Sequence, residues 1–251
     1  MNLQISKTAD QSGLQAAIAA EQMLRETLQK QDTARLLLST GASQFEFLTH
    51  FVKRDIDWSR VEMFHLDEYI GLPESHPASF RKYLKERFLQ HVNVKRAWLV
   101  DGEGHIPDVL QALKQEIARS PIDLALIGIG MNGHIAFNDP PANFEIEEPY
   151  MAVDLNDTCK DQQVGEGWFA TRADVPKQAV TMTVKQIMKS RRIISVVPHQ
   201  VKAEAIRNTM LQLVDPQYPS TMLKTHADWH LYLDQASASL IYRWCEPAAG
   251  E

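Results

Sequence analysis

The sequence predicts an α/β protein with a mostly parallel sheet, and two observations lead to this prediction. Short apolar runs alternate with amphipathic stretches, and one of these runs ends in a glycine-rich turn at residues 128–133. Strands that alternate with helices form parallel sheets. The chain of 251 residues contains no internal repeat, low-complexity tract or linker, and its length suits a sizeable core. We therefore expect residues 1–251 to form one domain.

The first half of the chain follows this alternation closely. Residues 10–30 are expected to form a helix, because Ala16, Ala20, Leu24 and Leu28 recur at helical spacing. The elements expected after it are strands at 36–38 and 61–64, helices at 79–92 and 106–119, and a strand at 123–128.

The second half contains one long interruption. Strands are expected at 179–182 and 193–197, then a helix at 202–213 and a last strand at 231–233. Residues 138–178 are rich in Pro, Asp, Glu and Gln and show no clear period. A connection of that length is more often a functional cover than a plain link. We expect this segment to act as a lid.

Composition excludes several classes of protein. No run of about eighteen apolar residues is present, and the first residues lack the profile of a secretory signal, so we expect a cytoplasmic protein without membrane contact. Two cysteines, Cys159 and Cys245, make neither a disulfide framework nor a thiolate metal site. A formal net charge of −6 disfavours nucleic-acid binding. A compact anionic metabolite remains a suitable ligand, because one local phosphate pocket needs no basic surface.

The glycine-rich turn carries the most informative chemistry. Residues 126–140 place His134 between Asn132 and Asp139, directly after an apolar strand. Glycines let the backbone approach a ligand closely, and imidazole titrates near neutral pH. This pattern favours proton transfer on a small molecule. The alternative, that His134 only caps or packs a turn, stays open at this point.

Two other loops fit a sugar phosphate. Thr40, Gly41, Ala42 and Ser43 follow the strand at 36–38 and open a helix, so their N–H and hydroxyl groups suit a phosphate. Ser43 could equally be an ordinary helix N-cap. Lys202, near the start of a later helix, would supply a positive charge for the same phosphate. A single lysine at a helix start is usually a solvated surface residue.

An acidic pair follows the strand at 61–64. Asp67 and Glu68 are adjacent, so we expect only one of them to face a site. A carboxylate held near a sugar carbon can act as a general base, particularly when burial raises its pKa. Otherwise the pair caps a turn or helix. Four loops stand out, and each follows a strand of one expected sheet, which would gather them along one edge. They carry residues 40–43, Asp67, His134 and Lys202.

Three ordered motifs resemble the glucosamine-6-phosphate deaminase/isomerase family. They are Thr40-Gly41-Ala42-Ser43, Leu66-Asp67-Glu68-Tyr69-Ile70-Gly71-Leu72-Pro73 and Gly130-Met131-Asn132-Gly133-His134-Ile135-Ala136-Phe137-Asn138-Asp139-Pro140. The resemblance runs from about residue 35 to residue 235. His76-Pro77-Ala78-Ser79-Phe80, Val175-Pro176-Lys177-Gln178-Ala179 and the Lys202 helix follow in the family's order and spacing.

The resemblance implies a Rossmann-like three-layer sandwich with a mostly parallel sheet. It also implies conversion of a phosphorylated amino sugar to a ketose phosphate and ammonia, without a metal or nucleotide cofactor. In that scheme Asp67 carries a proton between C2 and C1, and His134 helps to open the pyranose ring. The Thr40-Gly41-Ala42-Ser43 loop and Lys202 bind the phosphate. We add Asn132 and Asp139 to the expected catalytic set, and Glu68 and Gly133 to the substrate-binding set.

Two departures from the family pattern affect this expectation. The best-known deaminases have Asp-Gly-His and a later Glu where this chain has Asn132-Gly133-His134 and Asp139. An asparagine can orient an imidazole but cannot offset its positive charge. We therefore expect His134 to hold its proton less strongly, with Asp139 as the nearer acid.

The second departure lies in the expected lid. The family's arginine before an aromatic pair is replaced by Gly165-Glu166-Gly167-Trp168-Phe169. Arg172 follows a few residues later and could take the place of that arginine, but we expect it to be a solvated loop residue. The polar side chains of Gln162, Gln163 and Glu166 would suit sugar hydroxyls instead.

Two other functions are alternatives to deamination. A 6-phosphogluconolactonase has a similar Gly-His loop, but Ile135-Ala136-Phe137-Asn138 and Tyr69 favour the deaminase branch. A non-catalytic sugar-phosphate sensor would need a DNA-binding segment, and about thirty-five residues without a basic face precede the first expected strand. The sequence leaves open the preferred hexosamine phosphate, the effect of Asn132 on deamination, assembly into a homo-oligomer and allosteric control.

Overall fold

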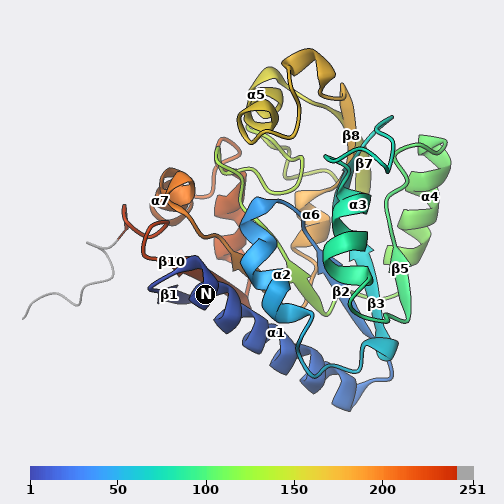
Figure 1. Ribbon diagram of the computed structural model, residues 1–251, viewed down its shortest axis with the longest axis vertical. Coiled ribbons are helices and arrows are strands. Elements are labelled where there is room, and N and C mark those ends of the chain that lie inside the picture. Colours follow the sequence, from blue (N-terminus) through green and yellow to red (C-terminus); the bar gives the residue numbers. More distant parts are fainter. Residues whose placement is uncertain (242–251) are drawn as a thin grey trace, which may run out of the picture.

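Seven parallel strands form the central sheet of the computed structural model, which describes residues 1–241 (Figure 1). Cys245 lies outside the described residues. The strands follow the order β1 (Asn2–Ser6), β10 (Trp229–Asp234), β9 (Ile193–Val196), β6 (Leu124–Leu126), β2 (Ala34–Leu38), β3 (Val61–His65) and β5 (Arg96–Trp98). The predicted α/β class is confirmed. Strands β1 and β5, which lie at the two edges, were not expected from the sequence.

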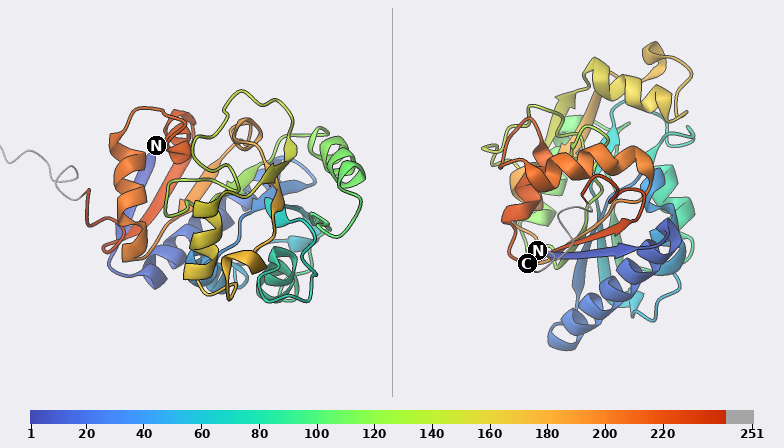
Figure 2. Two further views of the ribbon diagram at one scale, coloured as in Figure 1. Left: turned by 90° about the horizontal axis from the view of Figure 1, so that it is seen from above. Right: turned by 90° about the vertical axis from the view of Figure 1, so that its left-hand side faces the viewer.

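Helices cover both faces of this sheet, which gives the predicted three-layer sandwich (Figure 2). One face carries α1 (Ala9–Lys30), α2 (Phe45–Phe51) and α3 (Phe80–Leu84). The opposite face carries α4 (Ile106–Ile117), α6 (Val184–Ile187) and α7 (Ala203–Leu211). None of the helices among residues 1–241 combines the length and apolar character needed to cross a membrane.

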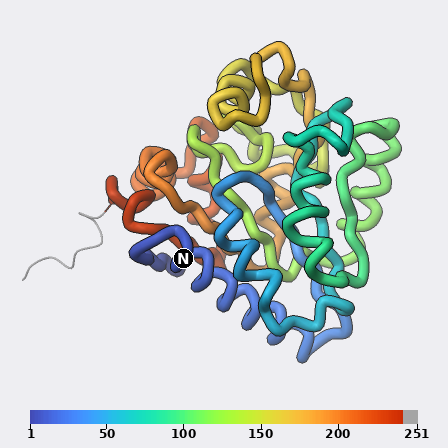
Figure 3. The backbone as a smooth tube through the Cα atoms, in the orientation of Figure 1, coloured from blue at the N-terminus to red at the C-terminus, as the bar shows by residue number. Residues whose placement is uncertain are grey.

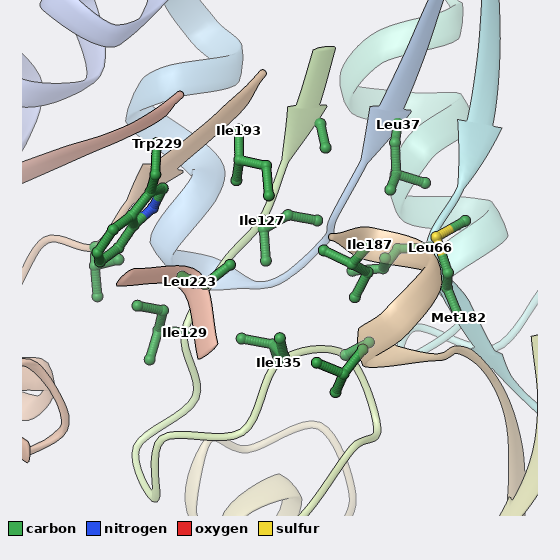
Figure 4. Close-up of a cluster of buried hydrophobic side chains, with 14 of the residues drawn as sticks. Leu37, Leu66, Ile127, Ile129, Ile135, Met182, Ile187, Ile193, Leu223 and Trp229 are labelled. Carbon is green, nitrogen blue, oxygen red and sulfur yellow. The ribbon is translucent and has the colours of Figure 1, made fainter. Parts of the chain in front are cut away.

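Strand β2 shows how the sequence builds two cores at once. All five of its residues are buried, because a parallel strand between two helical layers is apolar on both faces. Leu36 and Leu38 pack in the cluster beneath α1 and α2, whereas Leu37 packs in the opposite cluster. In Figure 4, Leu37 lies in the second cluster with Ile127, Ile187, Ile193 and Trp229.

A small antiparallel sheet lies beside the central one. Its order is β4 (Asp67–Tyr69), β8 (Gln178–Met182) and β7 (Tyr150–Asp154). The strand predicted at 179–182 exists but pairs antiparallel in this second sheet, so its assignment to the parallel sheet is wrong. A short buried apolar run carries no signal that distinguishes the two kinds of pairing.

The segment 138–178 is more regular than its composition suggested. It contains β7, the helix α5 (Asp157–Gly165) and the short helix η4 (Arg172–Asp174). A third apolar cluster, which includes Tyr69, Phe137, Cys159 and Phe169, joins this segment to the β4 region. In Figure 3 the yellow and gold part of the segment lies at the upper end of the molecule.

Short helical turns complete the described chain. They are η1 (Ala42–Gln44), η2 (Trp58–Arg60), the π-helical turn η3 (Lys85–Leu89), η5 (Gln200–Lys202) and η6 (Pro219–Thr225). The helix predicted at 79–92 corresponds to α3 and η3, and the one predicted at 202–213 corresponds to the end of η5 and α7.

The strand order determines where a ligand can bind. Strands β2 and β6 are neighbours, and the chain continues from them toward opposite edges of the sheet. Such a switch point opens a crevice beyond the carboxyl ends of the strands. The loops that follow β2, β3, β6 and β9 all leave the sheet at this edge.

Candidate active site

A cavity of about 610 Å³, including its open mouth, lies beyond the carboxyl ends of these strands. Five of the predicted site residues line it, namely Thr40, Ser43, Asp67, His134 and Lys202. They come from four loops that are far apart in the sequence, so the predicted convergence is observed. The other lining residues are Ser39, Leu66, Phe80, Gly128, Ile129, Gly130, Ala136, Phe137, Gln162, Gln163, Glu166 and Trp168.

The loop after β2 has backbone N–H groups that suit an anion. Gly41 has φ of 109°, a conformation that favours glycine. The N–H groups of Thr40 and Gly41 donate to no acceptor within residues 1–241. Ser43 does not cap η1; its hydroxyl instead accepts a hydrogen bond from the Gln44 side chain at 3.0 Å. The N-cap alternative for Ser43 is therefore wrong.

Lys202 lies at the end of η5, and its side chain is buried against the cavity. The residue is only 8% exposed, and its ammonium forms no ion pair with any described residue. Burial lowers the pKa of Lys202, although the charge of Glu166 acts in the opposite direction. A buried ammonium without a partner is unfavourable unless an anion binds beside it. The alternative of a solvated surface lysine is wrong.

Asp67 is the only carboxylate of the acidic pair that faces the cavity. It is 6% exposed, and its side chain accepts no hydrogen bond from the part of the chain that the structure describes. Burial, and then the nearby charge of Glu68, raise the pKa of Asp67 well above its ordinary value. A carboxyl group with a raised pKa accepts a proton more readily than an ordinary aspartate and can return it.

Glu68 is turned away from the cavity, which corrects its expected place in the substrate-binding set. The residue is fully buried and accepts hydrogen bonds from the backbone N–H groups of Tyr69, Phe80 and Arg81. It also pairs with the Arg81 guanidinium at 3.4 Å. Successive side chains of a strand point to opposite faces, so Asp67 and Glu68 on β4 cannot both reach the ligand.

His134 is held through a single ring nitrogen. Its Nδ1 lies 2.7 Å from Oδ1 of Asn132, and its backbone N–H donates to the same oxygen at 3.0 Å. An amide oxygen only accepts hydrogen bonds, so Nδ1 carries the proton. In the neutral ring, Nε2 is then the unprotonated nitrogen, and it has no hydrogen-bond partner within residues 1–241.

Asp139 supplies the negative charge that position 132 lacks. Its Oδ1 lies 3.2 Å from Nδ2 of Asn132 and 3.3 Å from Nδ1 of His134. Burial alone would raise the pKa of Asp139, but hydrogen bonding and charge from His134, followed by Asn132 and Cys159, lower it overall. Asp139 is thus a carboxylate near neutral pH.

Backbone geometry fixes the imidazole against the turn. A Cβ atom on Gly130 would lie 2.2–2.4 Å from the His134 ring, so any larger residue there would displace the imidazole. Gly133 adopts φ of 85° at the turn itself. Asn132, Gly133 and Asp139 adjoin His134 and are not among the residues that line the cavity. Gly41 and Ala42 are likewise not lining residues, so Gly41 would take part only through its backbone N–H group. The expected roles of these five residues stay predictions.

Helix α5 and the turn after it close one side of the cavity with polar side chains. The Tyr69 hydroxyl lies 2.7 Å from Oε1 of Gln163. The Glu166 carboxylate accepts hydrogen bonds from Gln162 at 2.8 Å and from the indole of Trp168 at 3.2 Å. Sequence reasoning named the two glutamines and Glu166 from polarity alone, but did not assign a contact to Tyr69 or Trp168.

The two-residue spacing between Asp67 and Tyr69 is the sequence signal that could have identified Tyr69 as a residue near the site. It stands two residues after Asp67 on β4 and so shares its face of the strand. Arg172, in contrast, is half-exposed and pairs with Asp157 and Asp161, as expected for a solvated loop arginine. Over residues 1–241, no group of three or more His, Cys, Asp or Glu side chains is arranged to hold a metal ion.

Comparison with known proteins gives consistent matches. A family profile described as glucosamine-6-phosphate isomerases/6-phosphogluconolactonase matches residues 7–231. A glucosamine-6-phosphate deaminase of Thermoanaerobacter pseudethanolicus is 32% identical over 231 residues, which cover 89% of each chain. One of Halothermothrix orenii is 36% identical over 208 residues, or 81% of this chain and 85% of that one.

Solved structures show the same fold. A structure described as a monomeric glucosamine-6-phosphate deaminase superposes with a TM-score of 0.87 at 27% identity, covering 96% of this chain and 100% of that one. A 6-phosphogluconolactonase from Trypanosoma brucei superposes with a TM-score of 0.79 at 14% identity, covering 96% and 98%. The second likeness concerns the fold alone.

Proposed function

Since this chain belongs to the glucosamine-6-phosphate isomerase/6-phosphogluconolactonase family and is an enzyme of its deaminase group, we propose that it converts an amino-sugar 6-phosphate to a ketose 6-phosphate. The substrate is glucosamine 6-phosphate or a close relative such as galactosamine 6-phosphate. Water replaces the amino group, and ammonia is the second product.

One observation carries this proposal. The same cavity is lined by two titratable groups in different states, namely the carboxyl of Asp67 and the imidazole of His134. Within residues 1–241, neither that carboxyl nor Nε2 of the imidazole has a hydrogen-bond partner. Paired titratable groups with different environments commonly divide acid and base roles. Isomerisation needs one base that can return its proton, and ring opening needs a second group that acts on oxygen.

The phosphate would bind at the Lys202 end of the cavity. Its oxygens would accept hydrogen bonds from the free N–H groups of Thr40 and Gly41 and from the Thr40 and Ser43 hydroxyls. The Lys202 ammonium would then gain the anionic partner that the described residues do not provide. This anchor fixes the position of the sugar carbons.

Ring opening would be the work of His134. Its Nε2 takes the proton from the C1 hydroxyl and delivers a proton to the ring oxygen, so that the C1–O5 bond breaks and an aldehyde forms. During this step the imidazole becomes positively charged for a short time. Asn132 keeps the Nδ1 proton in place, and the carboxylate of Asp139 stabilises that charge.

Asp67 would then move the proton between carbons. It removes the proton from C2 of the open-chain aldehyde while water protonates O1, which gives an enol that carries the amino group at C2. The Asp67 carboxyl then protonates C1, the amino nitrogen loses one proton to water, and an imine forms at C2. Water hydrolyses the imine to the ketone and ammonia. The raised pKa of Asp67 suits a group that must accept a proton and then donate one.

A substrate panel tests the proposal. Purified protein is mixed separately with glucosamine 6-phosphate, galactosamine 6-phosphate and 6-phosphogluconolactone, and ammonia, ketose phosphate and acid release are measured. We expect equal amounts of ammonia and ketose phosphate from at least one amino sugar. Acid release from the lactone without ammonia from either amino sugar would favour the lactonase alternative instead.

A further inference from the structure

Gln163 offers the cavity an N–H group of fixed direction. The side chain lies on α5, is 7% exposed and lines the cavity. Its Oε1 lies 2.7 Å from the Tyr69 hydroxyl. Its Nε2 donates to no acceptor within residues 1–241. A buried amide is expected to use its donors, so this N–H group is available to a bound molecule.

The direction of the amide follows from Tyr69. The tyrosine is fully buried, and its hydroxyl makes no other hydrogen bond with a described residue. Burial raises the pKa of Tyr69, so the hydroxyl keeps its proton. If the amide were reversed, that buried O–H would have no acceptor, which is unfavourable. The oxygen of Gln163 therefore faces Tyr69 and the nitrogen is left for the cavity.

The position of this donor relates it to the proton-transfer centre. Tyr69 and Asp67 lie two residues apart on β4, on the same face of the strand, and both Asp67 and Gln163 line the cavity. The Asp67 charge also acts on the Tyr69 hydroxyl, which agrees with their proximity. Through its bond to Tyr69, Gln163 belongs to the β4 side of the cavity, where Asp67 would act. The loop that would bind the phosphate follows β2, a different strand.

We propose that Gln163 is a specificity-determining residue whose Nε2 donates a hydrogen bond to a sugar oxygen beside the carbon that Asp67 deprotonates, and that Tyr69 is its positioning residue. The inference rests on the proposed function. The ligand of Gln163 would be a polyhydroxylated sugar phosphate, and the sugar oxygen would accept the hydrogen bond from Nε2. A site built to bond such an oxygen discriminates strongly when one partner is removed.

Three variants test this proposal together. Gln163→Met removes the donor while keeping a side chain of similar length, and Tyr69→Phe removes only the orienting hydroxyl. The double variant shows whether the two effects are coupled. Tyr232→Phe is the matched control, because Tyr232 is also buried, makes no side-chain hydrogen bond among residues 1–241 and does not line the cavity.

The expected results differ between variants. Gln163→Met should reduce kcat/KM for the amino-sugar phosphate about tenfold or more, and Tyr69→Phe roughly threefold to tenfold, as for single lost hydrogen bonds. The double variant should be no slower than Gln163→Met, because Tyr69 acts through the amide. Inorganic phosphate should bind all variants with unchanged affinity. Thermal melts report separately on folding.

A binding measurement keeps this test independent of turnover. Sorbitol 6-phosphate has the hydroxyls and phosphate of an open-chain sugar but cannot isomerise, and calorimetry gives its Kd. We expect Gln163→Met to weaken it about tenfold, with Tyr232→Phe unchanged. If wild-type protein releases no ammonia, the proposed function fails but the Kd comparison still tests Gln163. Equal Kd and kcat/KM values for wild type and Gln163→Met would overturn the inference, as would additive losses in the double variant.

Discussion

The Nδ1 atom of His134 lies 2.7 Å from the amide oxygen of Asn132, and that amide also bonds the carboxylate of Asp139 at 3.2 Å. The orienting group and the charged group are therefore two different residues. The Asp139 carboxylate is still close to the imidazole, at 3.3 Å from Nδ1. Asp139 thus supplies the negative charge that a carboxylate at position 132 would otherwise provide.

Changing Asn132 should separate these two roles. In Asn132→Leu the imidazole loses its acceptor and its fixed tautomer, so we expect kcat to fall by roughly a hundredfold or more. In Asn132→Asp the acceptor for Nδ1 is kept, so we expect kcat to fall much less than in Asn132→Leu. Steady-state kinetics of the two variants measure this difference. An unchanged kcat in Asn132→Leu would contradict the orienting role of Asn132.

Asp67→Asn should lose activity while gaining stability. The raised pKa of Asp67 means that the folded protein holds this proton more tightly than the unfolded chain. Its stabilising contribution is complete below the unfolded-state pKa and is lost as the pH rises through the higher folded-state pKa. Asp67→Asn removes this titration. Its Tm should therefore exceed that of wild type increasingly across that range, with inorganic phosphate still bound.

The pH dependence of activity is a second test of the role of Asp67 as the base. Because the base must be ionised, kcat/KM should fall on the acid side with an apparent pKa well above the ordinary 3.8 of aspartate. Asp139 should contribute no limb in the neutral range, since its pKa is lowered. A profile that is flat down to pH 4 would show that Asp67 is not the group that limits the reaction.

Lys202→Met should act mainly on binding. We expect KM for the sugar phosphate to rise about tenfold or more while kcat changes little, because the lost contact is the same in ground and transition states. In wild type, phosphate affinity should weaken as the pH rises toward the lowered pKa of Lys202. Glu166→Gln should shift this loss to lower pH, since the Glu166 charge raises that pKa. An unaltered KM in Lys202→Met would remove Lys202 from the site.

Glu68→Ala should primarily destabilise the protein. The carboxylate is buried, pairs with Arg81 and receives several backbone N–H groups at the start of α3. Removal of one partner from such a buried pair costs about 3–5 kcal/mol, which denaturant unfolding measures. Stability within about 1 kcal/mol of wild type would mean that water replaces these bonds easily.

How much of this was predictable depends on the kind of information that each residue carries. Asp67, His134 and Lys202 could be placed together, because loops after parallel strands share one edge of the sheet. The β4–β8 pairing could not be predicted, since three-residue strands have no measurable period. Only one of Asp67 and Glu68 was expected to face the site, but Glu68 was still kept in the substrate-binding set, because the sequence did not reveal strand β4 and its facing. The Gln163–Tyr69 bond joins residues 94 positions apart and depends on the tertiary fold.

The most direct measurement of the central claim is turnover of glucosamine 6-phosphate and galactosamine 6-phosphate in heavy water, with ammonium and ketose phosphate quantified together. The account predicts one ammonium for each ketose phosphate and solvent deuterium at C1, because the Asp67 carboxyl exchanges with solvent between the two proton transfers. Both should be lost in Asp67→Asn. Absence of ammonium from both amino sugars with correctly folded wild-type protein would contradict the claim.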